Sequence, residues 1–173
     1  MLSSEPVSKP SSFGLVFQPH LDYVSNQKEN HTEKTIQQKN KDLVLKAFDT
    51  LFNKRDYAAA ATFWSPKYIQ HSAHIEPGRD GLFNLIKSIP ATLKYEPGLI
   101  VAEDDFVIVH GRFSGMGLLL NWIAADILRI DNGILIEHWD VIQDDATEGQ
   151  SRSKAPMFDS AFPLYSNPEK TIG

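Results

Sequence analysis

The chain has 173 residues, of which 42% are hydrophobic and 23% charged, and its formal net charge is −5. These values are typical of one globular domain with a single core, and an acidic chain without a basic cluster argues against binding to nucleic acid or to an anionic membrane. The sequence contains no cysteine, which excludes disulfides and thiolate chemistry, and no apolar run long enough to span a membrane. We expect a cytoplasmic protein.

Composition divides the chain into three segments. Residues 1–35 are polar and aperiodic, which predicts a disordered N-terminal arm. Residues 36–158 carry the periodic apolar pattern of a folded domain. Residues 159–173 are expected to form a flexible C-terminal tail.

Three helices are predicted in the first half of the folded domain. Helical periodicity begins near Lys39. Asp56 is a suitable N-cap for a second helix over Tyr57–Trp64, which Pro66 would end. A third helix follows and ends at Pro90. The apolar stripe of the first helix consists of Leu43, Val44, Ala47, Phe48, Leu51 and Phe52.

The strand pattern begins with one short strand, Tyr68–His71, between the second and third helices. The last two strands are joined by Asp131-Asn132-Gly133, which is a strong hairpin signal. Because helices and strands are segregated along the chain, the pattern predicts an α+β domain. The four strands expected after the third helix are Leu93–Ala102, Phe106–Phe113, Leu119–Ile130 and Ile134–Gln143.

The strand Trp122–Ile130 is apolar on both faces, so it needs cover on both sides. The helices can cover one face. A second copy of the sheet could cover the other, and the pattern therefore predicts a homodimer.

Asp126 is the strongest candidate for a catalytic residue. It is the one ionisable group on a face that it shares with Ala124 and Leu128. Loss of solvation should raise the pKa of this carboxyl group, and such an acid can protonate a carbonyl oxygen or accept a proton from carbon. The alternative is a structural aspartate bonded to Arg129, to His138 or to the backbone.

The position of His138 depends on the length of the hairpin loop. With a three-residue loop, Asp126 faces His138 on the same side of the sheet. With a two-residue loop, Asp126 faces Trp139 and His138 points away. The sequence Asp-Asn-Gly permits both loops, and we favour the arrangement with His138 inside.

Three more histidines are candidate ligand contacts. A turn after the first strand could bring His71 and His74 to the mouth of a pocket, and His110 shares strand parity with Phe106 and Ile108. The alternative for each is a structural histidine in a satisfied hydrogen bond. The aromatic candidates, for which ordinary core packing is the stronger expectation, are Trp64, Tyr68 and Trp139.

No metal and no cofactor are expected. The spacing of His71 and His74 is not that of a helical metal motif, and the other possible ligands are scattered over several strands. The sequence also lacks a phosphate-binding glycine loop, a nucleophile elbow and a nucleotide fingerprint.

Three stretches, Tyr68–Gly81, Ala125–Gln143 and Pro156–Phe158, resemble the predicted SnoaL-like aldol-condensation proteins. These are a branch of the SnoaL-like polyketide cyclases in the nuclear transport factor 2-like superfamily. The run Glu-His-Trp-Asp-Val-Ile-Gln is fairly specific for the branch, whereas Ser72 and Ala73 replace the Asn-Pro of its usual Gln-His-Asn-Pro-His motif.

The resemblance covers about residues 40–158 and implies a nuclear transport factor 2-like conical fold. In that fold a strongly curved antiparallel sheet and three helices enclose a pocket, and the domain is usually dimeric. SnoaL-like cyclases also use an acid/base aspartate on the strand equivalent to that of Asp126.

Two functions are consistent with these features. The first is a cofactor-independent acid/base enzyme that carries out aldol cyclisation, isomerisation or dehydration on a small, largely apolar or polyketide-like carbonyl compound. Asp126 would be the acid/base, and His138, His110 or His71 would hold the carbonyl oxygen or relay the proton. The alternative is a non-catalytic domain that binds a small ligand or mediates assembly.

Overall fold

The computed structural model describes residues 33–158, so almost all of the expected arm and the whole of the expected tail lie outside the described residues. Among residues 33–158, no helix is long and apolar enough to cross a membrane. The elements, in order, are α1 (Ile36–Phe48), a π-helical turn η1 (Asp49–Asn53), α2 (Tyr57–Ala60), β1 (Trp64–Gln70), α3 (Gly78–Ser88), β2 (Lys94–Glu103), β3 (Phe106–Ser114), β4 (Trp122–Asp131) and β5 (Ile134–Asp144).

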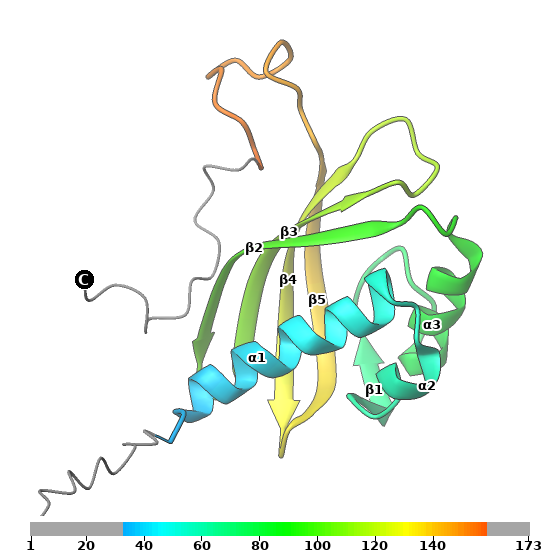
Figure 1. Ribbon diagram of the computed structural model, residues 1–173, viewed down its shortest axis with the longest axis vertical. Coiled ribbons are helices and arrows are strands. Elements are labelled where there is room, and N and C mark those ends of the chain that lie inside the picture. Colours follow the sequence, from blue (N-terminus) through cyan, green and yellow to red (C-terminus); the bar gives the residue numbers. More distant parts are fainter. Residues whose placement is uncertain (1–32, 159–173) are drawn as a thin grey trace, which may run out of the picture. The chain divides into compact units, whose positions relative to one another are not determined.

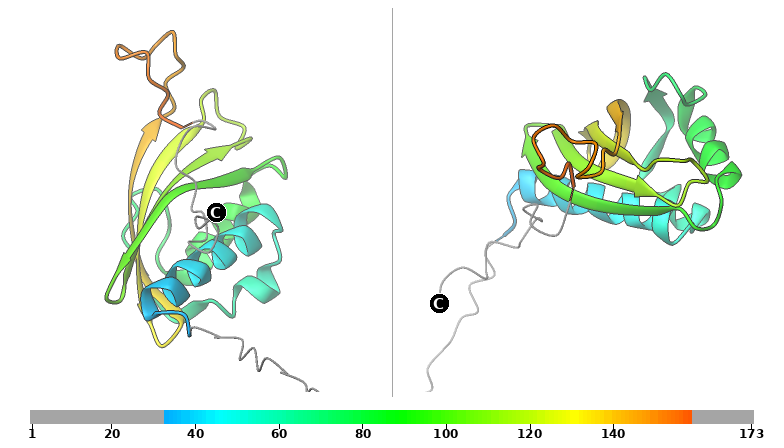
Figure 2. Two further views of the ribbon diagram at one scale, coloured as in Figure 1. Left: turned by 60° about the vertical axis from the view of Figure 1, so that its left-hand side comes forward. Right: turned by 90° about the horizontal axis from the view of Figure 1, so that it is seen from above.

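The five strands form one sheet in the order β1-β5-β4-β3-β2. Strand β1 runs parallel to β5, and all other neighbours are antiparallel. The sheet curves strongly, and the helices lie on its concave side (Figures 1 and 2). The predicted α+β class and curved sheet with three helices are therefore confirmed.

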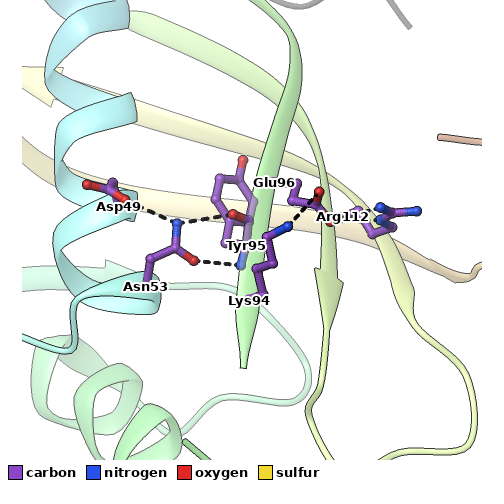
Figure 3. A network of polar contacts seen from close by, with 6 residues as sticks. All are labelled: Asp49, Asn53, Lys94, Tyr95, Glu96 and Arg112. Atoms are coloured by element: carbon purple, nitrogen blue, oxygen red, sulfur yellow. Dashed lines mark hydrogen bonds and ion pairs between the residues drawn. The ribbon is translucent and has the colours of Figure 1, made fainter. Parts of the chain in front are cut away.

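The core fills the space between the concave face and the helices. The apolar stripe predicted for the first helix is buried there from Val44 to Phe52, with Leu43 packed at its edge. The side chain of Asn53 faces the edge strand β2 (Figure 3). Its amide donates to the backbone oxygen of Tyr95 over 3.1 Å and accepts from the Tyr95 nitrogen over 2.8 Å. These paired bonds fix the helical layer against the sheet.

The second helix is shorter than predicted. Asp56 does cap it, because its carboxylate accepts from the Ala59 nitrogen over 3.0 Å, but the helix ends at Ala60 and Trp64 begins β1. Pro66 therefore lies inside a strand and does not end a helix. It is tolerated because β1 is an edge strand with an irregular register, where a missing N–H removes no required ladder bond.

The hairpin between β4 and β5 follows neither predicted register. Asn132-Gly133 form a two-residue loop with φ angles of 47° and 76°. Ile130 pairs with Leu135 whereas Arg129 pairs with Glu137, so β5 carries one extra residue, a β-bulge at Ile136. The bulge changes which β5 side chains point inward.

As a result of this bulge, Asp126 lies opposite Asp140, and His138 lies opposite Leu128. The loop has two residues, yet His138 is buried and points inward. The favoured orientation of His138 occurs, although the reasoning from loop length that led to it was wrong.

Gly111 on β3 gives a stability prediction. A Cβ atom at this position would lie 2.5 Å from a carbon of the Tyr95 ring and 2.6 Å from its hydroxyl oxygen. Because the Tyr95 ring is buried and packed against Phe48 and Phe113, Gly111→Ala should lower the free energy of unfolding by about 1–3 kcal/mol. Urea denaturation measures the change. Gly149→Ala, where the nearest atom is 3.9 Å away, is the control, and equal losses in both variants would contradict the packing described.

Candidate active site

An apolar cavity lies between the concave face of the sheet and the helices. Its inner part has a volume of about 60 Å³ and adjoins an outer chamber of about 220 Å³ that shares Ile75, Met116 and Trp122 with it. A cavity of this kind, with few polar groups in an apolar wall, is the usual form of a small-molecule site. The aromatic residues of the inner wall are Phe48, Phe52, Trp64, Tyr68, Phe113 and Trp122.

Two carboxyl groups and one imidazole enter this apolar wall from neighbouring strands. Asp126 comes from β4, and His138 and Asp140 come from β5. Only 4% of Asp126 and 5% of His138 are exposed. The sheet therefore places a compact polar group at the base of an otherwise apolar cavity.

Asp126 and His138 form a buried hydrogen-bonded pair. The Nε2 atom of His138 lies 3.0 Å from Oδ1 of Asp126, and its Nδ1 atom lies 2.9 Å from Oε1 of Gln70. The second carboxyl oxygen of Asp126 is buried and has no hydrogen-bond partner among the described residues. No described residue therefore competes with a ligand for a hydrogen bond to this oxygen.

Burial raises the pKa of Asp126 above its ordinary value of 3.8. The hydrogen bond to His138 acts in the opposite direction, and the charge of Asp140 adds to the increase. A raised pKa keeps a proton in the pair at a pH where an exposed aspartate has lost its own. This is the property that a general acid requires.

Other predicted ligand contacts also lie at the cavity. Trp64 and Tyr68 line its inner part, and burial raises the pKa of Tyr68 far above its usual range. His74 lines the outer chamber, where its ring lies 5.8 Å from that of Trp122. The turn after β1 therefore brings His74 to the mouth of the cavity.

Three predicted contacts lie instead on the outer, convex face of the sheet. His71 stacks on Trp139 with 4.7 Å between ring centroids and lies 2.8 Å from the carboxylate of Glu137. His110 stacks on Phe158 at 5.9 Å. Strand alternation explains the positions of His110 and Trp139, because their neighbours Val109 and His138 point inward.

Sequence reasoning missed Asp140 and Gln70. Asp140 has the same strand parity as His138, which was a usable signal once His138 was placed inside. Gln70 ends β1 and pairs with His138 across a parallel ladder. That pairing joins segments far apart in the chain, and no local pattern in the sequence predicts it.

The same three groups could also hold a divalent cation. Asp126, His138 and Asp140 each offer one ligand atom, and these atoms lie within 4.8 Å of one another. Within residues 33–158 no other group of this kind occurs. In the structure, however, Nε2 of His138 and Oδ1 of Asp126 form a hydrogen bond of 3.0 Å. A shared proton therefore explains why these two groups face each other.

The sequence of this domain matches the model of the SnoaL-like domain over residues 44–138. The chain belongs to the SnoaL-like domain family. The matched region begins in α1 and ends at His138, so it includes both members of the buried pair. Comparison with curated proteins gives no significant match.

Solved structures have a similar fold. AclR of Streptomyces galilaeus, described as a candidate hydroxylase, is 26% identical, with a TM-score of 0.50 over 60% of this chain and 88% of its own. A candidate ketosteroid isomerase from Kribbella flavida is 14% identical, with a TM-score of 0.57 over 75% of this chain and 97% of its own. A candidate polyketide cyclase from Acidithiobacillus ferrooxidans is 17% identical, with a TM-score of 0.53 over 64% and 92%. The fold is nuclear transport factor 2-like, as in a protein of that description from Cytophaga hutchinsonii, which is 16% identical, with a TM-score of 0.53 over 64% of this chain and 94% of its own.

The raised pKa of Asp126 predicts how stability depends on pH. A group whose pKa is higher in the folded chain contributes most to stability below its unfolded-state pKa, and this contribution is lost as the pH rises through the folded-state pKa. Asp126→Asn removes this titration. Its free energy of unfolding, relative to the wild type, should therefore increase as the pH rises from below about 4 toward neutrality.

Urea denaturation at a series of pH values measures this difference. Asp131→Asn, an exposed change at the end of the same strand, is the control and should show no such trend. If instead the relative stability of Asp126→Asn falls with rising pH, Asp126 is an ionised partner of a protonated His138.

Proposed function

We propose that this SnoaL-like domain is a cofactor-independent acid/base enzyme. It would carry out aldol cyclisation, isomerisation or dehydration on a small carbonyl compound. The observation that carries the proposal is the Asp126–His138 pair at the base of an apolar cavity, with one carboxyl oxygen free of partners among the described residues.

The proposed chemistry is a proton transfer next to a carbonyl group. At rest the pair holds its proton on Asp126. In the reactive form this proton has moved to Nε2 of His138, and Oδ2 of Asp126 can then accept a proton from the carbon beside the carbonyl. Before this transfer the imidazolium balances the charge of the carboxylate through the 3.0 Å hydrogen bond, and after it, when the carboxyl group is neutral, the imidazolium balances the charge of the enolate. In the reverse direction the protonated carboxyl group returns a proton to carbon or oxygen, as general acid/base catalysis requires.

The cavity wall favours a neutral, largely apolar substrate. Its charged groups are two carboxyls and a histidine, and neither lysine nor arginine lies among the lining residues. An anionic substrate would therefore meet like charge without a counter-ion. Aromatic rings around the cavity suit a planar or polycyclic carbonyl compound, which agrees with the polyketide cyclase name of one structural relative.

We also propose a homodimer through the outer face of the sheet. Val101, Ile108, Ile127 and Trp139 are paired in register and form an apolar row across four strands. Val101 is 47% exposed and Ile108 41% exposed in the single chain. A second copy would remove this apolar surface from water.

The competing function is a domain that binds a ligand without catalysis. The unpartnered Oδ2 atom of Asp126 argues against a purely structural aspartate, which usually has both oxygens in hydrogen bonds. Catalysis and binding are separated by the exchange of a carbon-bound proton.

Deuterium exchange at carbon tests the acid/base proposal without knowledge of the natural product. A panel of neutral cyclic ketones is incubated with the protein in D₂O, and loss of the α-proton signal is followed by NMR. We expect exchange with the wild type and a decrease of roughly 10²- to 10⁴-fold with Asp126→Asn, the usual share of general acid/base catalysis.

Asp144→Asn, an exposed change at the end of β5, should exchange at the wild-type rate. Ketones that bind with micromolar affinity but never exchange would support the binding domain instead.

Light scattering at micromolar concentration tests the dimer. We expect twice the chain mass for the wild type and the mass of one chain for Ile108→Glu, since a charge in the apolar row opposes its burial. Leu119→Glu, at a loop residue that is 98% exposed, should remain dimeric. A monomeric wild type would contradict the proposed dimer.

A further inference from the structure

Gln70 occupies an unusual position beside the catalytic pair. It is the last residue of β1, and its Oε1 atom lies 2.9 Å from Nδ1 of His138. The same Oε1 atom lies 2.9 Å from the backbone nitrogen of Ser72. One amide oxygen therefore faces both the catalytic histidine and the chain that leads to the mouth of the cavity.

The backbone of Ser72 fixes the orientation of the Gln70 amide. A backbone N–H can only donate a hydrogen bond, so the atom that faces it must be the oxygen and not the NH₂ group. A carbonyl oxygen has two lone pairs, and it can accept from Ser72 and from His138 together. Because this oxygen cannot donate, the Nδ1 atom of His138 must carry the hydrogen.

We infer that Gln70 is a positioning residue that holds His138 in the Nδ1–H tautomer and so directs its Nε2 atom to Asp126. This inference deepens the proposed function and rests on it for its catalytic consequence. With Nδ1 protonated, the contact between Nε2 and Oδ1 needs a proton, held either by the carboxyl group or by the imidazole. The pair thus keeps one transferable proton inside the cavity.

Loss of the Gln70 oxygen should change this arrangement. In Gln70→Leu a hydrogen on Nδ1 would be buried without an acceptor, which is unfavourable. The neutral imidazole should therefore move its hydrogen to Nε2 and donate it to an ionised Asp126. In Gln70→Glu the carboxylate still accepts from both donors, so the Nδ1–H tautomer should be retained.

Nitrogen-15 NMR of the imidazole side chains tests the inference, because the two ring nitrogens have different shifts in each tautomer. We expect Nδ1–H for His138 in the wild type and in Gln70→Glu, and Nε2–H in Gln70→Leu. Gln143→Leu, the same change at an exposed position of β5, should leave the spectrum of His138 unchanged. A neutral Nε2–H tautomer in the wild type, or Nδ1–H retained in Gln70→Leu, would overturn the inference.

The exchange assay adds a kinetic readout. The exchange rate for Gln70→Leu should fall at least about tenfold, as for other residues that orient a functional histidine. The acid limb of its pH–rate profile should move to lower pH. Gln70→Glu should keep most of the wild-type rate. The tautomer is measured in the absence of substrate, so a wrong tautomer refutes the role of Gln70 even if exchange occurs. If Gln70→Leu does not fold, the wild-type and Gln70→Glu spectra decide the question.

Discussion

A carboxyl group removed from water is the constraint on which the rest of the site depends. Asp126 lies among aromatic and aliphatic side chains, where its ionised form loses most of its solvation. Such a group is tolerated when it is neutral or paired, and His138 supplies the partner. The histidine in turn needs an acceptor at its other nitrogen, and Gln70 supplies it from a strand that lies far away in the sequence.

This chain of requirements links the fold to the chemistry. The parallel pairing of β1 with β5 brings Gln70 to His138, and the antiparallel pairing of β4 with β5 brings His138 to Asp126. The bulge in β5 turns His138 and Asp140 toward the cavity and leaves Glu137 on the outer face, where it bonds to Arg129 over 2.8 Å. The site is therefore a product of the sheet's register as much as of the residues themselves.

Much of the architecture could be predicted from the sequence, because it follows from local patterns. The apolar stripe of α1 and the Asn-Gly turn each have a local physical signature, and Asp126 was identifiable as the one charge on an apolar strand face. The face of β5 that points inward could not be predicted in this way. The bulge at Ile136 has no reliable signature, and it reverses the face that a two-residue loop alone would give to His138. His71, His110 and Trp139 were misplaced for related reasons, because they alternate with residues that point inward, and faces were assigned before the pairing of strands was known.

The central claim is that Asp126 keeps a proton because it is buried in the cavity wall. Carbon-13 NMR of the Asp126 carboxyl carbon, followed through a pH titration of the wild-type protein, tests this claim most directly. The account predicts a midpoint above the ordinary aspartate value of 3.8. A midpoint at or below that value would mean that Asp126 is an ordinary ionised partner of His138, and it would contradict the account.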